Sequence, residues 1–170
     1  MLRIGCIGCG NMGGGVLKGL AGKEGMELIG HDHTRAKVEA VAPGITWAET
    51  PCELAGKSDV IILAVKPYQM EAMLQEIRPV LTGDKIVVSL AAAFSVEKLR
   101  EGVAGACPVV RTMPNLPVVV GKGVFALCFD DPALSAEAKE GLLEIFRSLG
   151  VAVVLPEAQF PAFSSLVGCG

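Results

Sequence analysis

Cysteine and glycine residues near the amino end of the chain have spacings that fit two different kinds of chemistry. Cys6 and Cys9 form a CxxC pair, which is the spacing of thiols that bind a metal or exchange a disulfide. Gly8, Gly10 and Gly13 form a GxGxxG pattern in the same stretch, which is the spacing of a loop that binds the pyrophosphate of a dinucleotide. The surrounding sequence must decide between the two.

The cysteine pair lacks the partners that a metal or redox site needs. A zinc site would use a second CxxC or closely spaced histidines, and the sequence has no second CxxC. His31 and His33 are the only histidines, and they stand well beyond Cys9 in the chain. Most of the six cysteines are therefore predicted to be small buried side chains.

The glycine pattern stands between a predicted strand and a predicted helix. Residues 2–7 are apolar, and the apolar residues after the glycines recur at helical spacing. In such a unit Gly8 permits the tight turn, Gly10 lets the backbone approach the pyrophosphate, and Gly13 lets the helix pack against the strand. The start of the helix offers free N–H groups and a partial positive charge to phosphate. The sequence therefore predicts dinucleotide binding, with the CxxC as a coincidence.

Strands and helices are predicted to alternate along the rest of the chain. The apolar run 60–65 is typical of a strand buried on both faces of a parallel sheet, and residues 135–149 give the clearest helix. Further strands are expected at 27–31, 85–90, 109–111, 124–129 and 151–155, and further helices at 35–41, 67–77 and 95–101. This alternation indicates an α/β protein of Rossmann type, with a doubly wound, mostly parallel sheet.

Composition and charge restrict the class of protein further. Hydrophobic residues make up 51% of the 170 residues, so the chain can bury a core. The net charge of −3 offers no basic surface to nucleic acid or to an anionic membrane, and the longest apolar runs are too short to span a bilayer. The stretch after Arg3 resembles a signal peptide, but Asn11 and several glycines interrupt it. We therefore expect a cytoplasmic protein without nucleic-acid or membrane partners.

Polar residues after the second predicted strand bear on the choice of cofactor. Asp32 follows the glycine pattern at about the 20-residue distance at which an acid binds the ribose 2′-hydroxyl of NAD. The residues directly after it, His33, Thr34 and Arg35, with Lys37, could instead surround the 2′-phosphate of NADP, in which case repulsion would require Asp32 to turn away. We expect NADPH, with NADH as the alternative; these residues could also simply cap the next helix.

Several stretches of the chain, taken in order, resemble the pyrroline-5-carboxylate reductases. They are IGCIGCGNMGGGVLKGL from residue 4, DVIILAVKP from 59, VVSLAAAFSVEKL from 87, VVRTMPNLPVVVGKGVFAL from 109 and FSSLVGCG at the end. Together they cover nearly the whole chain, and the Met113-Pro114-Asn115 stretch is the most specific. The combination is therefore a strong resemblance, although each stretch alone would be a modest one.

The resemblance implies a cofactor site built from several loops and a substrate wall beside it. With the polar residues after the second strand, the predicted cofactor residues are Gly8, Cys9, Gly10, Asn11, Met12, Gly13, Asp32, His33, Thr34, Arg35, Ala64, Val65, Lys66, Pro67, Ala91, Ala92 and Ala93. The implied substrate residues are Met113, Pro114 and Asn115. Each set also has a structural interpretation, such as Pro67 as the first residue of a helix and the alanines as close packing. No catalytic residue is assigned, and Arg111 could bind an anion or form a structural ion pair.

A member of this family would reduce 1-pyrroline-5-carboxylate to L-proline, the last step of proline biosynthesis. Hydride passes from the nicotinamide to the C=N carbon of the cyclic imine, so the protein mainly holds two rings face to face and binds the substrate carboxylate. The alternatives are a related NADP-dependent dehydrogenase of the hydroxyacid type and a non-catalytic module that binds or senses a dinucleotide. The resemblance also implies a homodimer or higher homo-oligomer.

The chain departs from the family pattern at three positions and in its extent. Val167 and Cys169 stand where the family usually has serines, and Pro51 stands near the place of an asparagine that contacts the cofactor. The resemblance implies a dinucleotide-binding domain at 1–156 and, at 157–170, the start of the linker or first helix of a substrate and dimerisation domain. The rest of that helical domain would be missing, which would make the chain the cofactor-binding part of a longer reductase.

Overall fold

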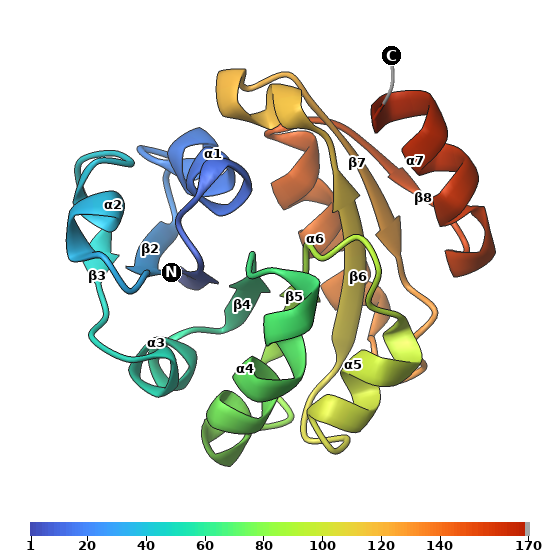
Figure 1. Ribbon diagram of the computed structural model, residues 1–170, viewed down its shortest axis with the longest axis horizontal. Coiled ribbons are helices and arrows are strands. Elements are labelled where there is room, and N and C mark those ends of the chain that lie inside the picture. The colour runs from blue at the N-terminus through green and yellow to red at the C-terminus, as the bar shows by residue number, and fades with distance from the viewer. Residues whose placement is uncertain (169–170) are drawn as a thin grey trace.

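The apolar segments of the chain form one eight-stranded sheet in the computed structural model, which describes residues 1–168 (Figure 1). The strands are β1 (Leu2–Ile7), β2 (Met26–His31), β3 (Thr46–Trp47), β4 (Val60–Leu63), β5 (Ile86–Ser89), β6 (Val109–Pro114), β7 (Gly123–Cys128) and β8 (Gly150–Val154). Their order in the sheet is β3-β2-β1-β4-β5-β6-β7-β8. All neighbours are parallel except β6 and β7, which are antiparallel. The predicted Rossmann-type, mostly parallel sheet is therefore confirmed.

Helices connect the strands and cover both faces of the sheet (Figure 1). The α-helices are α1 (Asn11–Leu20), α2 (Arg35–Glu39), α3 (Pro51–Lys57), α4 (Met70–Ile77), α5 (Val96–Gly102), α6 (Ala136–Arg147) and α7 (Phe160–Gly168). Short 3₁₀ turns are η1 (Pro67–Gln69), η2 (Arg78–Val80), η3 (Leu116–Val120) and η4 (Glu157–Gln159). Several helices begin at a side-chain cap: the Ser135 hydroxyl, for example, accepts a hydrogen bond from the Ala138 N–H at the start of α6.

Two hydrophobic cores lie on opposite faces of the sheet. Apolar side chains of α1, α2 and α6 pack on one face, and those of α3, α4, α5 and α7 pack on the other. The four residues of β4 are all buried, because this central strand has a helical layer on each side. An apolar run without alternation is the pattern that such a strand requires.

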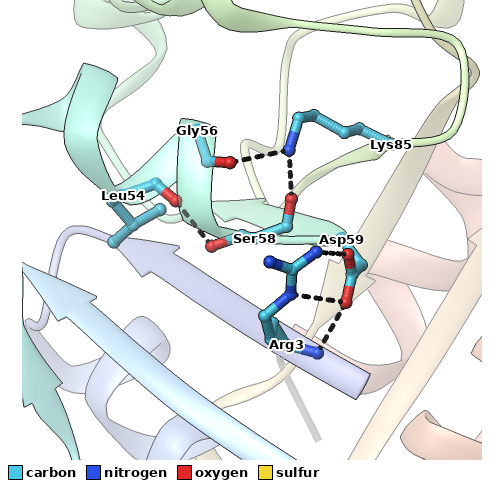
Figure 2. A network of polar contacts seen from close by, with 6 residues as sticks. All are labelled: Arg3, Leu54, Gly56, Ser58, Asp59 and Lys85. Carbon is cyan, nitrogen blue, oxygen red and sulfur yellow. Dashed lines mark hydrogen bonds and ion pairs between the residues drawn. The ribbon is translucent and has the colours of Figure 1, made fainter. Parts of the chain in front are cut away.

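A polar network at the amino ends of β1 and β4 fixes how these two strands lie together (Figure 2). The Arg3 guanidinium and backbone N–H donate to the Asp59 carboxylate. Lys85, which is 6% exposed, donates through its ammonium to the carbonyls of Gly56 at 3.1 Å and Ser58 at 2.7 Å. These bonds join three segments at the edge of the sheet opposite the glycine loop.

The sheet reverses its winding at β1. The chain passes from β1 outward to β2 and β3, then returns to the other side of β1 as β4 and continues to β5 and β6. Because β1 to β6 are parallel, the loops after β1, β2, β4, β5 and β6 all leave the same edge of the sheet. In open α/β sheets this edge, at the reversal point, is where ligands bind.

Some elements differ from the sequence-based expectation. Strand β3 has two residues, too few to give a period, and helix α3 was not predicted although Thr50 caps it and Pro51 begins it. Pro51 is buried there, and Val167 lies in α7; Cys169 and Gly170 lie outside the described residues. In residues 1–168 no helix is both long enough and apolar enough to cross a membrane.

Candidate functional site

Two of the three motif glycines are required by the fold. Gly8 has a φ of +94°, which favours glycine, and its N–H donates to the His31 carbonyl at 2.8 Å. A Cβ at Gly8 would lie 2.7 Å from the Ala64 carbonyl oxygen. At Gly13 a Cβ would overlap the Gly8 carbonyl oxygen and lie 2.8 Å from the Ala64 Cβ. Only glycine at these positions lets α1 start this close to β1 and β4.

Gly10 has no such reason in the fold. Its φ of −74° suits any residue, and a Cβ there would meet no atom within 4 Å in the described part of the chain. It is the residue before α1, so the first backbone N–H groups of that helix face the open space beside it. A glycine kept where a side chain would fit is expected where a ligand approaches the backbone.

Asp32 ties the glycine loop to the loop after β2. Its carboxylate accepts hydrogen bonds from the backbone N–H of Cys9 and of Thr34, each at 3.1 Å, and lies 3.5 Å from the Lys37 ammonium. Burial alone would raise the pKa of Asp32, but the bonds from Thr34 and Cys9 and the charge of Lys37 outweigh burial and lower it. Both carboxylate oxygens are thus engaged by the protein, so Asp32 is turned inward.

Replacing Asp32 by asparagine is expected to lower the free energy of unfolding by about 2 kcal/mol near pH 7, because hydrogen bonds to charged groups contribute about 1.5–3 kcal/mol. The folded-state pKa is lowered, so this contribution is present above the ordinary aspartate pKa and is lost as pH falls through the folded-state value. Urea unfolding followed by circular dichroism should therefore show the wild type and the variant converging at acid pH.

The control for this experiment is Glu39→Gln, which breaks the exposed Arg35–Glu39 pair of the same region. An exposed pair contributes little, so this variant should lose less than about 0.5 kcal/mol. A difference between the wild type and Asp32→Asn that does not change with pH would contradict the role of the carboxylate charge.

Two clefts open on either side of the glycine loop. The first, of about 250 Å³, is lined by Ile7, Gly8, Gly10, His31, Asp32, His33, Lys37, Ala64, Val65, Lys66, Gln69 and Met73. The second, of about 440 Å³, is lined by Cys9, Gly10, Asn11, Gly14, Gly15, Lys18, Lys37, Ala40, Val41 and Val119. Gly10 and Lys37 border both clefts, so a ligand over Gly10 could extend into either.

The loops after β1, β2 and β4 bring most of the predicted cofactor residues to these clefts. Five of them do not line either cleft: Met12 and Gly13, which lie in the first turn of α1, and Thr34, Arg35 and Pro67. Thr34 and Arg35 come just before and at the start of α2, where Arg35 pairs with Glu39 at 2.7 Å and its guanidinium lies 4.8 Å over the Trp47 ring. Pro67 begins η1, which is the structural alternative that the sequence offered for it.

The loops after β5 and β6 carry the remaining predicted residues beside, and not in, the two clefts. Ala91 is 4% exposed, whereas Ala92 and Ala93 are exposed. At the end of β6, Met113 and Pro114 are buried, and the Asn115 side-chain oxygen accepts a hydrogen bond from the Val124 N–H at 2.8 Å. In the strand order, β5 and β6 lie beyond β4, so the loops that follow them are on the opposite side of β4 from Asp32, which follows β2.

Sequence reasoning missed several residues that line the clefts. Gln69 and Met73 follow the loop after β4, and Lys18 and Val119 border the second cleft from α1 and η3. One signal was available for Gln69, because it stands three residues after Lys66 and its side chain accepts from the Lys66 N–H, as in a capping box. The others depend on tertiary packing.

The Cys6 and Cys9 thiols are packed inside the fold. Burial raises the pKa of the Cys6 thiol well above its usual value and raises that of Cys9 to about 11. The thiolate is the form that binds metal and attacks disulfides, so both groups are poorly suited to either task. Within residues 1–168 no group of three or more histidine, cysteine or acidic side chains could hold a metal ion.

Comparison with known proteins relates this geometry to a family. The family model described as NADP oxidoreductase, coenzyme F420-dependent, matches residues 3–93. The pyrroline-5-carboxylate reductase of Aquifex aeolicus is 34% identical over 99% of this chain and 63% of its own length, and that of Escherichia coli is 36% identical over 98% and 62%. The crystal structure of Plasmodium falciparum pyrroline carboxylate reductase with NADP bound superposes with a TM-score of 0.88 at 27% identity, over 99% of this chain and 63% of that one.

These matches cover this chain and its relatives to different extents. The chain is covered almost completely, but it spans less than two thirds of the length of these curated relatives. The likeness therefore includes every loop of the candidate site and leaves more than a third of each relative without a counterpart.

Proposed function

The chain belongs to the pyrroline-5-carboxylate reductase family, and we propose that it forms the cofactor-binding part of an enzyme that reduces 1-pyrroline-5-carboxylate to L-proline with NADPH. The single observation that carries the proposal is the open position at Gly10. It stands between two glycines that the fold requires, and the fold itself gives no reason for a glycine there. The NADP bound in the similar Plasmodium falciparum structure supports the same class of ligand.

The proposed cofactor lies across the glycine loop. Its pyrophosphate would bind over Gly10 at the start of α1, where free N–H groups and the helix dipole favour an anion. The adenosine half would enter the first cleft, near His33 and Lys66. The nicotinamide half would then cross the reversal point toward the loops after β4, β5 and β6, the direction that a dinucleotide takes in a doubly wound sheet.

Asp32 and Lys37 support NADPH as the preferred cofactor. Asp32 is turned toward the Cys9 and Thr34 N–H groups, so its oxygens are engaged and do not face a ribose hydroxyl freely. Lys37 partly neutralises that carboxylate and borders both clefts, so its ammonium is available to a 2′-phosphate. NADH remains the second candidate, because an acid at this position is typical of NAD binding.

Titration of the chain with NADPH and NADH tests this preference, and we expect NADPH to bind more tightly. Lys37→Gln should weaken NADPH binding about tenfold and NADH binding less than about twofold, because only NADPH carries the 2′-phosphate. Lys57→Gln is the control, since it removes the same charge from α3 in the other helical layer. Equal losses for both cofactors would contradict the 2′-phosphate assignment.

The substrate would meet the cofactor near the end of β6. When bound, the nicotinamide supplies the hydride for the C=N carbon of the imine. Met113 and Pro114 would form an apolar wall there, and Asn115 holds the following turn through its bond to Val124. We propose residues 1–156 as the dinucleotide-binding domain and 157–170 as the start of the part that completes the substrate site.

The activity is tested on a protein in which this chain is joined to a segment like the one that its relatives carry beyond the match. We expect oxidation of NADPH that depends on 1-pyrroline-5-carboxylate. Oxidation that depends instead on a hydroxyacid's keto partner would favour the related dehydrogenase. Cofactor binding without turnover of either substrate would favour a dinucleotide sensor.

The assembly and location of the protein are further parts of the proposal. We propose a homo-oligomer, as the resemblance to the family implies, and Leu166 on α7, which is 77% exposed, is one apolar side chain that such packing could cover. The described cysteines, which are free thiols, are compatible with a reducing compartment such as the cytoplasm. Size-exclusion chromatography of the longer protein would test the first of these statements.

A further inference from the structure

Arg111, at the middle of β6, joins two loops that are distant in the sequence. Its side chain is 13% exposed. The guanidinium donates through Nη1 to the Glu157 carboxylate at 2.8 Å and through Nη2 to the Ala92 carbonyl at 2.6 Å. It also lies 4.8 Å over the Phe160 ring at the start of α7. Arg111 is therefore fixed from three directions.

The ion pair holds the loop between β5 and α5 at both ends. At one end of the loop, Arg111 donates to the Ala92 carbonyl. At the other end, the Val96 N–H donates at 2.9 Å to Glu157 Oε1, which is the oxygen that Arg111 also contacts. Residues 92 to 96 are thus bracketed by one pair of charged groups. Within this loop Phe94 is packed in the core at 5% exposure, whereas Ala92 and Ala93 are exposed, so the bond from Arg111 fixes the part of the loop that packing leaves unsupported.

This arrangement is costly if stability is its only purpose. A partly buried ion pair, with the Arg111 and Glu157 side chains 13% and 29% exposed, must offset part of the hydration that both groups lose, and apolar residues often do as well in its place. The Arg111 Nε atom is also buried without a hydrogen-bond partner among the described residues, so the guanidinium is not fully compensated. What the pair does provide is a fixed direction for the loop that it brackets.

The bracketed loop begins at the carboxyl end of β5, whereas Asp32 follows β2. The two therefore lie on opposite sides of β1, where the sheet reverses its winding. A dinucleotide that places its adenosine half by the loop after β2 extends its second half toward the loops after β4 and β5. Resting on the proposed function, we infer that Arg111 and Glu157 are positioning residues that hold residues 92–96 against the nicotinamide half of the cofactor. The adenosine half lies out of their reach.

Two ligands distinguish this role from a merely structural one. NADPH contains the nicotinamide half, whereas 2′-phospho-ADP-ribose has the same adenosine half and pyrophosphate without the nicotinamide. In calorimetric titrations of the chain, Arg111→Lys should weaken NADPH binding about tenfold, because one ammonium cannot make both bonds of the guanidinium. Binding of 2′-phospho-ADP-ribose should stay within about twofold of the wild type.

Further variants make the outcome decisive. Arg111→Met should give a larger selective loss for NADPH, and Glu157→Gln, which keeps an acceptor oxygen for Val96, a smaller one. Arg100→Lys is the matched control. The Arg100 side chain pairs with Asp131, at a distance of 3.5 Å, and not with the bracketed loop, so this variant should bind both ligands like the wild type.

The results separate this inference from the proposed function. If the folded Arg111 and Glu157 variants bind NADPH as the wild type does, or lose both ligands equally, the inference is overturned while the cofactor site stands. If the wild-type chain binds neither ligand, the proposed function fails and the inference fails with it.

Discussion

Gly10→Ala is expected to weaken NADPH binding about 100-fold while the chain stays folded. The added methyl group would occupy the space over the start of α1, where we propose that the pyrophosphate lies against the backbone. Apart from Gly10 itself and its two chain neighbours, no atom of the described residues lies within 4 Å of the position that this methyl carbon would take. Alanine is a poorer residue than glycine before a helix, but it also restricts the unfolded chain, so the free energy of unfolding should change by less than about 1 kcal/mol.

Fluorescence titration with NADPH and urea unfolding of the same preparation check the two halves of this prediction. Gly141→Ala is the control, because Gly141 is exposed on α6 and an added Cβ there also meets no neighbour within the described residues. This variant should bind NADPH like the wild type. Normal binding by Gly10→Ala would mean that no ligand approaches the backbone at Gly10, and the proposed function would lose its main support.

The glycine loop could be predicted from the sequence because its requirements are local. A strand, a tight turn and a helix follow one another within the first 20 residues, and two of the motif glycines, Gly8 and Gly13, have a steric reason within that short segment and its neighbouring strand. The parallel sheet could be predicted as well, since β4 shows the uninterrupted apolar run of a strand covered on both faces. These signals need no knowledge of distant contacts.

The orientation of the polar residues could not be predicted in the same way. The sequence offered Asp32 and Lys37 as opposing arguments about the cofactor, and it took the bond from the Cys9 N–H, 23 residues away, to show that Asp32 faces inward. From the sequence, Arg111 could bind an anion or form an ion pair. The structure shows the ion pair, with Glu157, which is 46 residues further along the chain. Such choices depend on which segments the fold brings together.

Gly13→Ala is expected to destabilise the fold by about 3 kcal/mol or more, although alanine is the better helix former by about 1 kcal/mol. The new Cβ would overlap the Gly8 carbonyl oxygen and lie 2.9 Å from the Cys6 Sγ, and the backbone of the turn cannot yield as a flexible side chain could. Helix α1 would have to move away from β1, which would open the core beneath it. Urea unfolding measures the loss as a lower midpoint at an unchanged slope.

The same change at Gly141 gives the opposite sign, which makes the comparison informative. Gly141→Ala adds a methyl in open space inside a helix and should stabilise the chain by about 0.5–1 kcal/mol. If Gly13→Ala proved as stable as the wild type, α1 would be able to shift without cost, and Gly13 would not be a packing requirement. If Gly13→Ala lowers the free energy of unfolding while Gly10→Ala lowers only the affinity for NADPH, the two glycines have the separate roles that the structure indicates. One is then kept for the fold, and the other for a ligand that the fold does not need.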